Sequence, residues 1–433
     1  MSVKRRWGTA GRWARGGTAA MCVMVALAGQ ARAAGASAAY TFAEGAEQVD
    51  GAASTSGAPT LGAGRTYRDT IRTGERLTYR VDLDAARSAY VSAVAVPRAG
   101  SRVTFSDGIK VSLQDRDGYD CSSNESRFGS AEFPRPLAAY AHRTIEKDRT
   151  SCQEAGPYYV VVERSDKETA GPVPWDLEIR HVLEPRVKAT GPTAAPTNWP
   201  SASPQPVAGT PRARTGGSGF FDATGLEQGE WTDTIEPGRS RFYRVPVDWG
   251  QQIFASADLG SSTGDGFVGG ALAVTLYNPV QGVVSSTDSL SYDGKQKSAA
   301  LDPLPPVRYE NRFDSSAKFE DTRFAGWYYL RVSLSPEVGA KFGKKPYGLT
   351  LRIFVRGQAG QPPAYDGPAG IFAVTEDDKE QAASGQSSSE AHRSDTMRIV
   401  AAAGIGTGTV LVGGLGVWTL LARRRATSTP STW

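Results

Sequence analysis

Residues 67–81 read Tyr-Arg-Asp-Thr-Ile-Arg-Thr-Gly-Glu-Arg-Leu-Thr-Tyr-Arg-Val, and residues 231–245 read Trp-Thr-Asp-Thr-Ile-Glu-Pro-Gly-Arg-Ser-Arg-Phe-Tyr-Arg-Val. The two stretches align without a gap and share the frame aromatic-x-Asp-Thr-Ile-x-x-Gly-x-x-x-x-Tyr-Arg-Val. A long frame that recurs in the same order predicts two related domains in one chain.

Each copy of the frame predicts a short strand, a turn and a second strand. Thr73-Gly74 and Pro237-Gly238 suit a tight turn, because Gly supplies the positive φ that the second central position of a type II turn needs. The strand that follows alternates with period two, so that one side is apolar: Leu77, Tyr79, Val81 and Leu83 in the first copy, and Tyr243, Val245 and Val247 in the second. Arg80 and Arg244 lie on the other side, which we expect to face water.

The correspondence continues downstream of the frame. Val111-Ser-Leu matches Val274-Thr-Leu, and Ala155-Gly-Pro-Tyr-Tyr-Val-Val-Val matches Ala325-Gly-Trp-Tyr-Tyr-Leu-Arg-Val. Short alternating runs bounded by Gly, Pro and Asp, without a long amphipathic helix, favour β-sandwiches. We therefore predict an all-β protein with two tandem jelly-roll-like sandwiches.

These motifs resemble the bacterial pre-peptidase C-terminal domain, a jelly-roll-like module of secreted proteins. The resemblance is carried by an early Gly-x-x-x-x-Tyr-x-Val, a late Gly-x-Tyr-x-x-x-Val and a final aromatic-x-Leu strand. The early motif corresponds to Gly74/Tyr79/Val81 and Gly238/Tyr243/Val245. The late motif corresponds to Gly156/Tyr158/Val162 and Gly326/Tyr328/Val332. The final strand corresponds to Trp175/Leu177/Ile179 and Tyr347/Leu349/Leu351. The resemblance implies a non-catalytic accessory or binding module, although this chain has no peptidase domain for it to assist.

The two ends of the chain have the composition of sorting signals. A basic start, an apolar run and Ala31-Arg-Ala33 predict a secretory signal peptide over residues 1–33. Residues 398–421 contain the uncharged run Ile399–Leu421, which is long enough for a membrane helix, and Arg423-Arg-Arg follows it. We therefore expect a bacterial cell-surface protein with an extracellular ectodomain, one transmembrane helix and a short cytoplasmic tail.

Composition divides the rest of the chain. The segments that we expect are a flexible lead-in over 34–58, the first sandwich over 59–184, a Pro/Thr/Ala-rich linker over 185–218, the second sandwich over 219–357, a disordered stalk over 358–397 and a cytoplasmic tail over 422–433. The net charge of +4 becomes −5 once the six basic residues of the leader and the three of the tail are removed. An acidic ectodomain argues against nucleic-acid binding, which normally needs a basic patch.

Cys121 and Cys152 are the only cysteines outside the leader. An even pair in an exported chain predicts a disulfide, and the two residues lie in a part of the first domain that the second domain lacks. Closing a loop of this length stabilises a protein by about 3–4 kcal/mol on the loop-entropy model.

Asp115, Asp117 and Asp120 are the candidate metal ligands. Alternate Asp residues around Gly118 supply the oxygen ligands that calcium prefers, but the same residues also form an Asp/Gly hairpin turn. We favour the turn and expect no other cofactor.

No convincing catalytic set emerges from the sequence. Gly260-Ser-Ser-Thr-Gly264 matches the nucleophile elbow, but no helix is expected after it and His392 is the only later histidine, so we interpret it as a loop. His142 and His181 are far apart in the first domain and do not have zinc-ligand spacing. One member of Tyr158-Tyr159 and of the Trp327-Tyr-Tyr run could face a sugar or a partner.

We therefore expect a membrane-anchored binding or scaffolding protein, not an enzyme, that presents its two modules to envelope polysaccharide or to a protein partner. Two alternatives stay open: a hydrolase that uses the carboxylates of residues 115–120, since paired acids suffice for glycoside hydrolysis, and a purely structural spacer. Because the residues that the copies share are those of a scaffold, we expect function in the Cys121–Cys152 insertion and in the loop over 260–270.

Overall fold

The structure is a computed structural model. It describes residues 40–98, 101–146, 149–165, 172–188, 191–204, 209–391, 393, 415–421 and 423, which belong to one compact unit. The predicted signal peptide, most of the predicted membrane helix over 398–421 and the tail except Arg423 lie outside these residues. Among the described residues, no helix is both long and apolar enough to cross a membrane.

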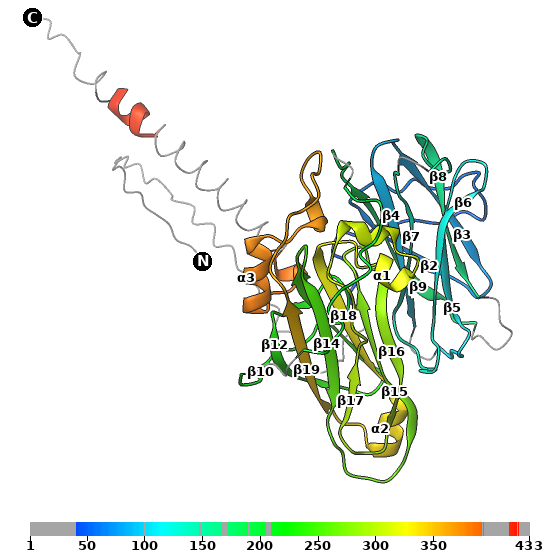
Figure 1. Ribbon diagram of the computed structural model, residues 1–433, viewed down its shortest axis with the longest axis vertical. Helices are drawn as coiled ribbons and strands as arrows, with labels where there is room; N and C mark the ends of the chain where they lie inside the picture. Colours follow the sequence, from blue (N-terminus) through cyan, green and yellow to red (C-terminus); the bar gives the residue numbers. More distant parts are fainter. Residues whose placement is uncertain are drawn as a thin grey trace, which may run out of the picture. The chain divides into compact units, whose positions relative to one another are not determined.

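The first sandwich consists of two sheets with the strand orders β1-β2-β9-β4-β7 and β3-β8-β5-β6 (Figure 1, blue to green). Its strands are β1 Glu47–Gln48, β2 Thr66–Ile71, β3 Arg76–Leu83, β4 Ser88–Pro97, β5 Gly108–Gln114, β6 Asp120–Arg127, β7 Leu137–Arg143, β8 Gly156–Arg164 and β9 Trp175–Glu184. One apolar core lies between the two sheets and includes Tyr79, Val111, Val160 and Trp175.

The second sandwich has the orders β10-β12-β19-β14-β17 and β11-β13-β18-β15-β16. Its strands are β10 Arg212–Ala213, β11 Thr224–Gly225, β12 Gly229–Ile235, β13 Ser240–Val247, β14 Gln252–Leu259, β15 Val268–Tyr277, β16 Val283–Tyr292, β17 Lys297–Ala300, β18 Gly326–Leu334 and β19 Tyr347–Arg356. The labelled helices between and after these strands are η1 Tyr309–Phe313, α1 Ala317–Glu320, α2 Pro336–Phe342, η2 Gly370–Phe372 and α3 Glu376–Ser384.

Both sandwiches have the same topology. The order β2-β9-β4-β7 corresponds to β12-β19-β14-β17, and β3-β8-β5-β6 corresponds to β13-β18-β15-β16. Two four-stranded layers connected in this way form a jelly roll. The prediction of an all-β fold with two tandem jelly-roll-like sandwiches is confirmed.

The shared frame builds the same buried contact in each sandwich. Tyr79 is fully buried and donates its hydroxyl proton to Asp69 Oδ2 at 2.7 Å, and the Gly51 N–H donates to the same oxygen at 2.8 Å. A Cβ on Gly51 would lie 2.8 Å from the Tyr79 ring, so only glycine fits there. Gly216, Asp233 and Tyr243 repeat these contacts in the second sandwich, with a tyrosine hydroxyl bond of 2.6 Å and a glycine N–H bond of 2.8 Å.

These glycines show that both sandwiches begin earlier than the composition predicts. Gly51 lies in the expected flexible lead-in, where β1 also pairs with β2. Gly216 lies in the expected linker, where β10 pairs with β12. Farther back in the same linker, the Pro200 carbonyl oxygen accepts a hydrogen bond of 2.8 Å from the Gln252 side chain. The described parts of the lead-in and linker are thus built into the fold, and the expectation of loose segments there is wrong.

The expectation of a disordered stalk is also wrong for residues 358–391, which we call the C-terminal segment. Its helix α3 (orange in Figure 1) begins with a capping box, in which Thr375 and Asp378 each accept from the other's backbone N–H. Phe372, just before the helix, is 1% exposed and packs with Tyr90, Tyr140 and Phe324. The segment is therefore ordered because it covers apolar side chains of both sandwiches.

The two sandwiches pack against each other through the outer faces of two sheets. Strand β4 is buried over residues 88–95, which leaves neither of its faces to water. Its outer side chain Val94 packs with Phe242 of β13 and Tyr277 of β15 in a second apolar cluster. Arg331 of β18 donates to the Pro136 carbonyl oxygen across the same contact. The expectation of one buried and one wet face per sheet fails for these two sheets.

Arg244 shows the consequence of this packing for the shared frame. It was expected to face water like Arg80, which is half-buried and pairs with Asp82. Arg244 is instead 4% exposed, because the C-terminal segment lies over it and Gln381 Oε1 accepts from its guanidinium at 2.7 Å. Equivalent positions in the two copies therefore have different surroundings.

We predict that Tyr79→Phe and Tyr243→Phe each lower the free energy of unfolding by about 1.5–3 kcal/mol. Each substitution removes a donor from a buried or nearly buried carboxylate without changing the shape of the ring. Urea titration followed by tryptophan fluorescence measures the change. Tyr119→Phe is the matched control, because Tyr119 is 57% exposed. A loss no larger than that of the control would contradict the structural role of the frame.

Candidate functional site

A groove runs between the first sandwich, the second sandwich and the C-terminal segment. It consists of two hollows of about 580 and 320 Å³ that share lining residues. The shared residues are Arg180, Trp327, Tyr329, Ile371 and Gln381. They come from β9, β18, η2 and α3, so the groove exists only where these parts are assembled.

Two aromatic rings line both hollows. Trp327 and Tyr329 lie on the outer face of β18, whereas Tyr328 between them is buried in the core. Trp327 Nε1 donates to Asp378 Oδ1 at 2.7 Å, and the Arg244 guanidinium lies 4.0 Å from the centre of its ring. Tyr329 packs edge-on against Phe220 at 5.3 Å. Both rings are half-buried, so part of each is available to a ligand.

Two buried charges of the first hollow already have partners within the protein. Glu178 accepts from the Tyr40 hydroxyl at 3.0 Å and from the Ala43 N–H at 2.8 Å. Burial raises the pKa of Glu178 in spite of these bonds. Arg244 donates to Gln381 and to the Gln386 carbonyl oxygen, and burial lowers the pKa of Arg244.

Arg180 differs from these groups. It is half-buried on the outer face of β9 and lines both hollows. Its Nη1 donates to the Pro279 carbonyl oxygen over a long 3.5 Å. Rings, amides and a guanidinium are groups that bind and orient a ligand.

Sequence reasoning named the Trp327 run but missed the rest of the groove. Arg180 lies in a strand where it reads as an ordinary outward charge, and Gln381 lies in the expected stalk. One signal was available for α3: Thr375-Glu-Asp-Asp378 has the spacing of a capping box, and Gly385 is a typical helix stop.

The predicted calcium ligands form a hairpin turn. Asp115 Oδ1 accepts from the N–H groups of Asp117 at 3.0 Å and Tyr119 at 2.9 Å, and Gly118 has φ +84°. Asp120 Oδ1 instead accepts from the Gln114 side chain at 2.9 Å. Among the described residues, no group of three or more His, Cys, Asp or Glu side chains is placed to hold a metal ion. The turn interpretation therefore accounts for these residues.

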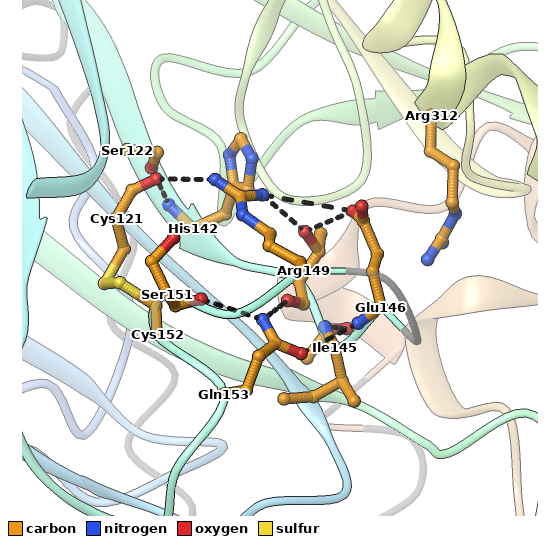
Figure 2. A network of polar contacts seen from close by, with 12 residues as sticks. Cys121, Ser122, His142, Ile145, Glu146, Arg149, Ser151, Cys152, Gln153 and Arg312 are labelled. Carbon is orange, nitrogen blue, oxygen red and sulfur yellow. Dashed lines mark hydrogen bonds and ion pairs between the residues drawn. A yellow bond between two sulfur atoms is a disulfide. The ribbon is translucent and has the colours of Figure 1, made fainter.

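The predicted disulfide between Cys121 and Cys152 is present. Figure 2 shows the polar network beside it, in which Arg149 Nη2 donates to the Cys121 carbonyl oxygen at 3.3 Å. Gln153 holds the same loop by donating to the Thr144 carbonyl oxygen at 3.0 Å. Ser122 and His142 meet here, but the Ser122 hydroxyl accepts from the backbone N–H of His142. This contact does not use the imidazole ring, so the pair lacks the geometry of a nucleophile and its base.

A hollow of about 190 Å³ adjoins the disulfide and bears on the hydrolase alternative. It is lined by Asp115, Asp117 and Glu154, so carboxylates do meet a concave surface. Asp117 and Glu154 are exposed and lie 3.7 and 3.3 Å from the Arg116 guanidinium. These two carboxylates of the hollow therefore already have an ion-pair partner in Arg116, and the hydrolase alternative stays a prediction.

The remaining catalytic candidates are not brought together. Strand β14 ends at Leu259 and the next element is β15, so residues 260–264 join two strands, as the loop interpretation predicts. His392 lies outside the described residues. His181 Nδ1 lies 3.1 Å from the Leu61 carbonyl oxygen, and burial lowers the pKa of His181.

Two buried acids lie in the contact between the sandwiches. Glu184, 1% exposed at the end of β9, accepts from the hydroxyls of Tyr90 at 2.7 Å and Tyr365 at 2.9 Å. It also accepts from Arg312 Nη2 at 3.2 Å. These three donors come from the first sandwich, the C-terminal segment and the second sandwich. Glu184 thus joins all the parts that form the groove.

The other buried acid, Asp321, lies before β18 and accepts from the Tyr140 hydroxyl of β7. Burial raises the pKa of Asp321 to about 7, while Arg323 and the Tyr140 bond act in the opposite direction and Glu320 adds to the rise. His142 stacks on Tyr140 with ring centres 5.6 Å apart. Burial lowers the pKa of His142, and nearby arginines lower it further.

Comparison with known proteins does not assign the chain to a family. No family model matches it, and no curated protein matches it. The resemblance to pre-peptidase C-terminal domains therefore stays a prediction.

Three solved structures show how distant the structural matches are. The CUB1-EGF-CUB2 domain of human MASP-1/3 is 9% identical with a TM-score of 0.17, and the match covers 66% of this chain and 99% of that one. The CBM22-1-CBM22-2 tandem of Paenibacillus barcinonensis Xyn10C is 13% identical with a TM-score of 0.20, and the match covers 75% of this chain and 95% of that one. The ANX1 ectodomain of Arabidopsis thaliana is 8% identical with a TM-score of 0.19, and the match covers 69% of this chain and 86% of that one. Such TM-scores establish no shared fold, so the jelly-roll assignment depends on this chain's own strand order.

We predict that Asp321→Asn removes a pH dependence of stability between about pH 4 and 7. The folded chain binds the Asp321 proton more tightly than the unfolded chain, so unfolding free energy falls as the pH rises toward 7. Asparagine stays neutral and its oxygen can still accept from Tyr140. The variant should gain up to about 4 kcal/mol over the wild type at pH 8 and little at pH 4.

Urea titrations of both chains across this pH range measure the difference. His142 acts in the opposite direction, because its lowered pKa makes stability rise with pH, but it is present in both chains. A constant difference across the pH range would contradict the prediction.

Proposed function

We propose that this chain is an extracytoplasmic binding protein whose two sandwiches together hold a cell-envelope polysaccharide in the groove. The observation that carries the proposal is the origin of the lining: Arg180 comes from the first sandwich, Trp327 and Tyr329 from the second, and Gln381 from α3. A ring offers an apolar face to the C–H face of a sugar, and guanidinium and amide groups offer hydrogen bonds to its hydroxyls.

A membrane tether completes the proposal. The leader over 1–33 exports the chain, and the run over 398–421 anchors it with the sandwiches outside the cell. The sequence supports this anchor, and so do the described residues at the C-terminal end of the run over 398–421. There Leu415, Trp418 and Leu420 lie on a helix, and each is more than 60% exposed. Apolar side chains of this size favour lipid over water.

The proposal separates the roles of the two ends of the molecule. Residues 358–391 pack on the sandwiches, so only a short length of chain separates α3 from the anchor. Under this proposal the groove lies near the membrane, where it meets the inner side of an envelope polymer. A spacer that only lifts its domains away from the membrane would not need such packing.

The test is binding of the purified full chain in detergent to insoluble envelope polysaccharide, measured by co-sedimentation. We expect Tyr329→Ala to weaken binding at least tenfold, because it removes a ring shared by both hollows. Phe267→Ala is the control, since Phe267 is 65% exposed and does not line the groove.

Thermal unfolding of each variant shows whether a loss of binding reflects misfolding. Absence of binding by the folded wild type, or equal binding by Tyr329→Ala, would overturn the proposal.

A further inference from the structure

The charges that line the first hollow differ in how far they are already paired. Arg65 pairs with Glu47, and Glu44 pairs with Arg393. Glu178 and Arg244 are buried and hydrogen-bonded, as described above. Each of these groups would have to give up an existing partner to bind a ligand ion, which costs free energy.

Most of the N–H donors of Arg180 are not used in hydrogen bonds to the described residues. A guanidinium carries five N–H donors in a fixed planar fork. Among the described residues, the one hydrogen bond from this fork is the 3.5 Å contact with the Pro279 carbonyl oxygen, which is too long to be strong. Arg180 is half-buried and lines both hollows, so its guanidinium lies at a surface that is partly shielded from water.

The acidic groups of the groove do not neutralise this cation fully. Glu178, the neighbouring outward residue on β9, acts on Arg180 through its charge, while its oxygens accept hydrogen bonds from Tyr40 and from the Ala43 N–H. Asp378 accepts from Trp327 and caps α3. Asp377 lines only the second hollow and is exposed, where water and salt screen its charge.

A partly desolvated guanidinium beside two aromatic rings selects a ligand with an anionic group next to a ring-shaped apolar surface. A guanidinium binds a carboxylate through two parallel N–H···O bonds, which is stronger and more directional than a contact with a hydroxyl. A sugar acid has both features, because its carboxylate projects from a ring whose C–H face can lie on Trp327 or Tyr329.

We propose that the groove recognises a polysaccharide with carboxylate-bearing sugars, and that Arg180 binds the carboxylate. This inference rests on the proposed function, since it names the class of polymer that the same groove takes. Arg180 is then the specificity-determining residue, while Tyr329 supplies affinity for acidic and neutral sugars alike.

The experiment compares two probes of the same backbone: polygalacturonate and its fully methyl-esterified form, which lacks the charge. Binding of the full chain in detergent to each is measured by isothermal titration calorimetry. We expect the acid form to bind at least tenfold more tightly at low salt and to lose part of this advantage at 0.5 M salt.

Arg180→Gln should reduce the preference for the acid form to less than twofold, because the acid form loses its bonds to the charged fork whereas the ester loses only hydrogen bonds from its uncharged groups. Arg180→Lys should retain part of the preference, because it keeps the charge and loses the fork. Arg102→Gln is the matched control: Arg102 is exposed in the first sandwich and does not line the groove.

Each result decides the inference. Equal affinity for the two forms, no binding of either form, or a preference that survives Arg180→Gln would overturn it. Those outcomes leave the proposed function to the co-sedimentation test with Tyr329→Ala, because a neutral envelope polymer could still bind through the rings.

Discussion

The outer face of β4 is the constraint on which the rest of the structure depends. Most jelly-roll strands bury one face, but β4 carries Tyr90 and Val94 on the face that points away from its own core. Apolar surface of this kind is stabilised by about 25 cal/mol for each Å² removed from water. The second sandwich and the C-terminal segment provide the cover, so the two domains pack together instead of moving independently on a linker.

Buried polar groups fix how the two sandwiches meet. An apolar contact alone tolerates sliding, whereas Glu184 needs Tyr90, Tyr365 and Arg312 in place at once. Leaving one member of such a buried pair without its partner costs about 3–5 kcal/mol. The polar contacts therefore select one arrangement of the parts, and that arrangement brings Arg180 of the first sandwich and Trp327 of the second into the lining of one groove.

Sequence reasoning succeeded where one strand carries its own signal. Tyr79 and Tyr243 sit in a repeated frame because each closes a buried contact within its own sandwich, so the repeat predicts both jelly rolls. The groove is different, because its residues are brought together by packing between domains. In the sequence, a charge such as Arg180 has the pattern of an exposed residue, because the packing of the second sandwich against it is not visible there. Trp327 belongs to the late motif that both copies share, whereas we expected function in the parts where the copies differ.

The central claim is that the two jelly rolls and the C-terminal segment form one cooperative unit held by Glu184. Differential scanning calorimetry of the wild type and Glu184→Ala tests it most directly. The account predicts one unfolding transition for the wild type, which splits into two when Arg312 is left buried without its partner. Two transitions in the wild type, both unchanged by the substitution, would show that the sandwiches are independent and would contradict the account.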